Sequence, residues 1–198
     1  MIKYSCHTFA KMPKSEVVVL PVSLLKDFSK HFSALENLKK KNHPEKGSYK
    51  VFNALNCDQT FVIYNFDFSQ FRALESLKAC MRDIAHLSVA SINFILEFVE
   101  DLTLVSQSVE QAFFSYDDFK SKKNTQSIKK IAFCLKTTRK AIQDMDKGLS
   151  RAYAIALART LAEMPSNVCT PLYLTKQAEK LAKKHKNIEA SIFDKKQC

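Results

Sequence analysis

Glycine is almost missing from this chain. It occurs only twice in 198 residues, at Gly47 and Gly148, and tryptophan does not occur at all. Loops that wrap phosphate groups or close around metal ions use several glycines, because positive φ angles and close backbone approach are costly for other residues. The sequence has no glycine-rich loop, which argues against a self-contained nucleotide-binding site.

Paired cysteines and long apolar runs are also lacking. No two cysteines form a CxxC pair, and the six are scattered as Cys6, Cys57, Cys80, Cys134, Cys169 and Cys198. This usage is typical of reduced thiols in a cytosolic protein. Residues 1–16 have no apolar segment of the kind that targets a chain for export, and the apolar run 17–22 is too short to span a bilayer. We expect a soluble, cytoplasmic protein.

The histidines do not pair at the spacings that metal ligands use. Cys80 and His86 are six residues apart and do not share a helix face. The sequence therefore predicts no metal site built from its histidines and cysteines. The five histidines are His7, His31, His43, His86 and His185.

The formal charge of +11 is unevenly placed. Residues 61–119 have a balance of −6, whereas residues 120–150 have a balance of +7. One hypothesis is that the second stretch contacts nucleic acid. The alternative is a solvated, lysine-rich surface, which we favour because few aromatic residues interleave with the basic ones. The lysines that would make the contact are Lys122, Lys123, Lys129 and Lys130.

Apolar runs alternate with amphipathic segments through the first two thirds of the chain. The pattern predicts strands at 17–22, 49–55, 60–66, 89–98 and 128–135. It predicts helices at 28–41, 69–86 and 104–116. This β-α-β-α-β order predicts an α/β fold with a mixed, largely parallel sheet and flanking helices.

Two details of these elements are specific enough to check. Pro21 marks an edge strand or a strand end, because proline cannot donate to a sheet ladder. Ser69 is the expected N-cap of the helix 69–86. The expected buried stripe of that helix is Phe71, Leu74, Leu77, Cys80 and Met81.

A long helix follows over 138–164 and ends before Pro165, because the residue that precedes a proline is disfavoured in the α region. Thr170 and Pro171 then predict the start of another helix, and residues 187–193 alternate like a strand. One helix and one strand cannot bury both faces of that strand. We therefore expect an α/β domain at 1–137, a linker helix at 138–164, and the start of an incomplete domain at 165–198.

The segment around this turn resembles the junction between the two domains of the leucine aminopeptidase (cytosol aminopeptidase) family. A shorter segment, 116–122, is similar to one late in the family's first domain. The junction positions of that pattern are filled here by Ala158, Arg159, Leu161, Pro165, Asn167, Thr170, Pro171 and Tyr173.

Three of these residues have an expected structural role. Asn167 is expected to fix the turn through hydrogen bonds from its side chain to the backbone. Arg159 either anchors the junction through an ion pair or is an ordinary exposed helix residue. Thr170 is expected to cap the helix that Pro171 opens.

The resemblance implies a macro-like amino-terminal domain, a linker helix and the first helix–strand unit of a truncated catalytic domain. A complete family member removes amino-terminal residues from peptides with two divalent ions, manganese or zinc, and assembles as a hexamer. The family's metal ligands and catalytic residues lie in glycine-containing motifs of the second domain, and no such motif occurs before Cys198. We therefore expect this chain alone to be inactive and to serve assembly and access to the active site.

Two other interpretations stay open. The chain could be a basic nucleic-acid-binding or regulatory module, or an inactive truncated product. The last interpretation predicts poor solubility, because the apolar faces of residues 172–193 would be exposed.

Overall fold

The computed structural model describes residues 2–29, 35, 43–53, 59–98, 102–122, 125–193 and 197. The chain divides into two compact units, Met1–Ala156 and Leu157–Cys198, and the boundary falls within one long helix. None of the helices in the described ranges is long and apolar enough to cross a membrane.

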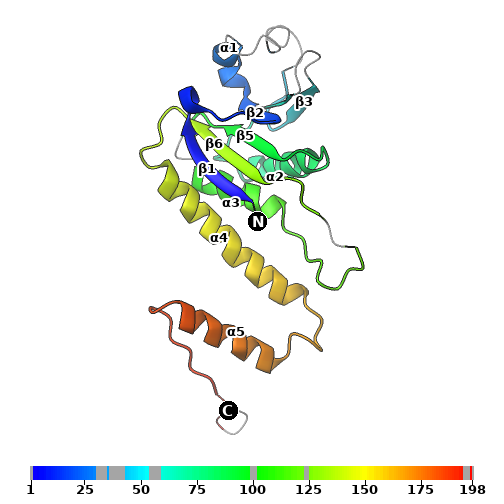
Figure 1. The fold of residues 1–198 in the computed structure, drawn as a ribbon, viewed down its shortest axis with the longest axis vertical. Helices are drawn as coiled ribbons and strands as arrows, with labels where there is room; N and C mark the ends of the chain where they lie inside the picture. The colour runs from blue at the N-terminus through cyan, green and yellow to red at the C-terminus, as the bar shows by residue number, and fades with distance from the viewer. Residues whose placement is uncertain are drawn as a thin grey trace. The chain divides into compact units, whose positions relative to one another are not determined.

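The first unit is built around a mostly parallel sheet (Figure 1). The described strands are β1 (Lys3–Thr8), β2 (Val17–Pro21), β3 (Tyr49–Asn53), β4 (Thr60–Tyr64), β5 (Ser91–Ile95) and β6 (Lys130–Leu135). Their order in the sheet is β1-β6-β5-β2-β4-β3. Only the edge pair β3–β4 among these pairings is antiparallel. The predicted mixed, largely parallel α/β fold is confirmed.

Helices of the first unit connect and flank these strands (Figure 1). In chain order the α-helices are α1 (Leu25–Phe28), α2 (Phe71–Ala85), α3 (Leu102–Ala112), α4 (Ala141–Glu163) and α5 (Pro171–Lys184). Two short 3-10 helices, η1 (Phe9–Lys11) and η2 (Val22–Leu24), follow β1 and β2.

The central strand β2 is buried along its whole length, as expected for a parallel strand covered on both faces. Val17 and Val19 point into the larger core, which α2, α3 and α4 cover. Val18 and Leu20 point into the smaller core beneath α1. Pro21 lies at the end of this strand, which is one of the two positions that the sequence predicts for it.

The first half of α4 packs closely on α3 at Gly148. A Cβ atom at this glycine would lie 2.0 Å from the side-chain oxygen of Ser106 and 2.3 Å from the backbone oxygen of Thr103. Two hydrogen bonds join the helices nearby: the Thr103 hydroxyl donates to the backbone oxygen of Asp144 at 3.2 Å, and the Ser106 hydroxyl donates to that of Met145 at 3.3 Å. Glycine is therefore required here for space.

The N-cap and the first buried residue that the sequence predicts for α2 are both wrong. The N-cap is Gln70, without a side-chain cap bond, whereas the Ser69 hydroxyl donates to Asp67 at 2.6 Å. Phe71 is 75% exposed, because the 3.6-residue period places it on the face opposite the buried residues of this helix. The buried stripe is Ala73, Leu77, Cys80, Met81 and Ile84, with Leu74 only partly buried.

Two strand expectations also need correction. Residues 187–193 form no strand, and Ile188, Ile192 and Phe193 are exposed there. Alternation alone is insufficient, because a strand needs a neighbour to pair with. Conversely, β1 is a strand that the sequence pattern does not predict. Most of the expected helix 28–41 lies outside the described residues.

The second unit contains the end of α4, a turn at 164–170, α5, and an extended stretch to Phe193. The Thr170 hydroxyl caps α5 by accepting from the Tyr173 backbone N–H at 3.3 Å, and Pro171 occupies the first turn. This start is as the sequence predicts. All 14 residues of α5 are described, and none of them is buried.

Candidate functional site

The junction residues lie in the second unit, at the end of α4 and the start of α5. Arg159 forms an ion pair with Glu163 one turn later, at 3.6 Å, and both side chains are nearly half exposed. Backbone bonds help to close the turn: Val168 and Cys169 both donate to the carbonyl oxygen of Pro165 at 2.9 Å. The role expected for Asn167, which is exposed, stays a prediction.

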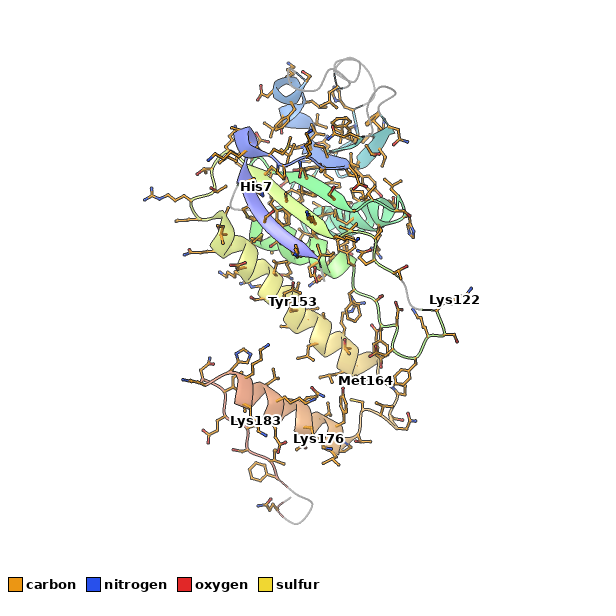
Figure 2. The ribbon with its side chains drawn as sticks, viewed as in Figure 1. His7, Lys122, Tyr153, Met164, Lys176 and Lys183 are labelled. Atoms are coloured by element: carbon orange, nitrogen blue, oxygen red, sulfur yellow. The ribbon has the colours of Figure 1, made fainter. Side chains whose placement is uncertain are left out.

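The lysines of the basic stretch lie in different places. Lys130 begins β6 and is in register with Lys3 of β1, whose backbone N–H donates to the carbonyl oxygen of Lys129 at 2.9 Å. Lys122 is exposed on the loop between α3 and β6 (Figure 2). Lys123 lies outside the described residues. The structure therefore brings together Lys3, Lys129 and Lys130 at the amino ends of two neighbouring strands.

The histidines of the described ranges lie on separate segments of the chain. His7 lies on β1, where its ring nitrogen is 3.0 Å from the hydroxyl oxygen of Ser5. His43, His86 and His185 are exposed on separate segments. No group of three His, Cys, Asp or Glu side chains among the described residues could hold a metal ion. These residues do not fit the two-metal centre that the family resemblance implies for a complete enzyme.

The buried titratable groups serve packing. Burial raises the pKa of the Cys6 thiol to about 11 and that of the Cys134 thiol to about 12. These thiols are protonated at neutral pH, which is unsuitable for a nucleophile. The Tyr4 hydroxyl donates to the Glu110 carboxylate and so joins β1 to α3, and burial together with Glu110 raises the pKa of Tyr4.

A cleft lies at the carboxyl ends of β2, β4 and β5, and we call it the switch-point cleft. β2 is the middle strand of the three, with β4 on one side and β5 on the other. After β2 the chain continues toward β4 and β3, whereas after β5 it continues toward β6 on the opposite side, so the connections diverge at this edge of the sheet. Ligands bind at such an edge in open α/β sheets. The cleft has a volume of about 200 Å³ and is lined by Pro21, Val22, Ser23, Tyr64, Asn65, Phe66, Phe68, Glu97 and Phe98.

Hydrogen bonds between segments far apart in sequence hold the walls of this cleft. The Tyr64 hydroxyl donates to the Ile95 carbonyl oxygen at 2.8 Å and joins the ends of β4 and β5. The Ser23 hydroxyl donates to the Glu97 carboxylate at 2.6 Å and joins the segments after β2 and β5. Phe66 stacks on Tyr64 with 5.2 Å between ring centroids. The cleft is thus a formed feature of the first unit.

Sequence reasoning misses this cleft, although the sequence holds a signal for it. Polar residues follow three apolar runs at Ser23, Asn65 and Glu97. If the runs are parallel strands, their carboxyl ends meet at one edge of the sheet. The order of the strands was needed to show that these three ends are neighbours.

No protein-family model matches the chain. A probable cytosol aminopeptidase of Nitrosococcus oceani is 35% identical over 104 residues, which cover 48% of this chain and 21% of that protein. One of Chromobacterium violaceum is 30% identical over 142 residues, covering 64% of this chain and 27% of that protein. The chain therefore matches between a fifth and about a quarter of the length of these relatives.

A solved structure of a tomato leucine aminopeptidase mutant has a similar fold. Its TM-score is 0.81 at 12% sequence identity, and the match covers 100% of this chain and 45% of the tomato chain. At this identity the likeness establishes the fold and carries no statement about activity.

Proposed function

We infer that this chain, which is related in sequence to the cytosol aminopeptidases, is the amino-terminal portion of a leucyl aminopeptidase-like metallopeptidase. The predicted resemblance to that family is confirmed by the sequence relatives and by the shared fold. The single observation that carries the proposal is the 30–35% identity to proteins named as probable cytosol aminopeptidases.

The complete protein would release amino-terminal residues from peptides in the cytoplasm. Two divalent ions, manganese or zinc, would supply an activated water and a polarised carbonyl. We assign these ions to a following catalytic domain, because the resemblance places the metal ligands in glycine-containing motifs of the family's second domain. No catalytic residue, metal ligand or cofactor is assigned to this chain.

The domain division that we propose is a macro-like domain at 1–137, a linker helix at 138–164, and the beginning of the catalytic domain at 165–198. The first unit, which also includes the first half of the linker helix, has its own buried cores on both faces of the sheet. The second unit exposes Leu172, Leu174, Leu181, Ile188, Ile192 and Phe193. Exposed apolar side chains in this number are typical of a surface that another part of a protein covers.

The proposed role of this portion is assembly of a hexamer and control of access to the active site. The reading frame beyond codon 198 gives a direct test. We expect an in-frame or frameshifted continuation that encodes lysine and Asp/Glu residues within glycine-containing motifs. A downstream sequence unrelated to aminopeptidases in all three frames would contradict the proposal.

A second candidate function is a nucleic-acid-binding module, favoured by the cluster of Lys3, Lys129 and Lys130. This function requires binding of an oligonucleotide that weakens steeply with salt, because lysines release counterions from phosphates. Filter binding with the quadruple variant in which Lys122, Lys123, Lys129 and Lys130 become glutamine tests it. Unchanged binding in that variant would exclude these lysines as the contact.

A further inference from the structure

The switch-point cleft has a single charge in its described lining. Among the nine described lining residues, Glu97 is the one with a charged side chain. The Ser23 hydroxyl bonds one of its oxygens, Oε2. A carboxylate held in place in this way presents a fixed acceptor to a bound cation.

The part of the sequence that supplies most of the lining is acidic. Six of its lining residues, from Tyr64 to Phe98, come from the stretch 61–119, whose charge balance is −6 in a chain of net charge +11. A carboxylate-lined hollow in an acidic stretch attracts positive ligands. A phosphate group would find neither a lysine or arginine nor a glycine-rich loop in the described lining. Nucleotides are therefore poor candidates for this cleft.

Aromatic rings stand beside the carboxylate. Phe98 lines the cleft and is 58% exposed, so a ring next to Glu97 in the chain is open to a ligand. Phe66 lines it as well and is only partly buried. A guanidinium group is planar, stacks on aromatic rings and donates several N–H groups to a carboxylate. A compact ammonium group lacks the planar surface for such stacking.

We propose that the switch-point cleft binds a small organic cation of the guanidinium class, with Glu97 as its ionic partner and Phe98 as a stacking wall. The volume of about 200 Å³ suits a small ligand with one such group. The proposal is independent of the aminopeptidase assignment, because the residues that carry it all lie in the first unit.

Calorimetric titration of the whole 198-residue chain with agmatine, at low salt, tests the proposal. Agmatine carries a guanidinium group and a primary ammonium group on a short alkyl chain. Pentylurea is a neutral compound of similar shape, and pentylamine carries the ammonium group alone and should bind more weakly than agmatine. We expect saturable agmatine binding that Glu97→Gln weakens by about tenfold or more, because the ion pair is lost. Phe98→Ala should weaken it by a smaller factor, and pentylurea should not bind measurably.

The matched control is Glu75→Gln, which removes one carboxylate from the exposed face of α2, where Glu75 pairs with Lys78. This variant should bind agmatine like the unaltered chain. Circular dichroism of each variant verifies that it is folded. Absence of saturable binding, equal binding by Glu97→Gln, or equal binding of pentylurea would overturn the proposal.

Discussion

At the scale of single residues, Gly148 makes the most direct prediction. Replacing a helical glycine by alanine ordinarily stabilises a helix by about 1 kcal/mol. Here the new methyl group would overlap the backbone oxygen of Thr103 in α3, which cannot rotate away. We expect Gly148→Ala to lower the free energy of unfolding by about 1–3 kcal/mol, as measured by urea denaturation.

The control for this variant is Ser150→Ala, since Ser150 is exposed on the same helix. That change should leave stability equal or slightly higher, because alanine is the better helix former. A Gly148→Ala protein as stable as the Ser150→Ala protein would show that α3 and α4 do not pack as closely as described.

The cysteines give a second residue-scale prediction. Burial raises the pKa of the Cys6, Cys80 and Cys134 thiols and limits reagent access to them. Cys169 lies in the turn before α5 and is partly exposed. In the native protein near pH 8 we expect iodoacetamide to label Cys169 before Cys80 and Cys134, which are buried and should react only after unfolding, as followed by peptide mass spectrometry. Early labelling of Cys80 would contradict its burial.

At the scale of elements, α5 and α2 can be compared directly. Their lengths are nearly equal, at 14 and 15 residues, but α2 has five buried residues and α5 has none. Local stability follows buried apolar contact. Hydrogen exchange in the isolated chain should therefore be much faster in α5 than in α2, whose amides serve as the internal control.

Equal protection of α2 and α5 would contradict this prediction. It would require a surface that covers α5, whereas none of the residues of α5 is buried. In a complete aminopeptidase, by contrast, our proposal expects α5 to become protected. Comparing hydrogen exchange in the 198-residue chain with that in a longer chain thus distinguishes the stability of α5 itself from the protection that a covering surface gives it.

Elements with strong local signals could be predicted from sequence. The buried strands β2, β4 and β6 contain continuous apolar runs, β5 alternates apolar and polar residues, and α5 begins at a Thr-Pro pair. β1 could not be found in the same way. Its sequence, Lys3–Thr8, is largely polar and only partly buried, and its pairing with β6 defines it as a strand. The stretch 187–193 is the converse case, with a strand pattern and no strand.

The candidate site shows the same limit more strongly. Ser23, Asn65 and Glu97 lie in separate parts of the sequence, and only the strand order β5-β2-β4 makes them neighbours. The junction residues, in contrast, lie within one short segment of the sequence, so a local pattern predicts their turn and helix cap. Sequence therefore predicts local geometry here, and tertiary contacts create the cleft.

At the scale of the whole molecule, the two units differ in how far their apolar residues are buried. The first unit is a complete α/β layer structure with two buried cores. The second unit presents an apolar surface with an N-capped helix that has no buried residue. This contrast is expected of a chain that corresponds to 45% of a leucine aminopeptidase structure.

The central proposal is that the reaction centre of the complete aminopeptidase-like protein lies in a part that this chain does not contain. The most direct measurement is hydrolysis of leucine p-nitroanilide by the purified 198-residue protein with added Mn²⁺. We predict a rate equal to that of buffer with Mn²⁺ alone. Turnover above that level, removed by substituting a residue of this chain such as Glu97 or His7, would contradict the account.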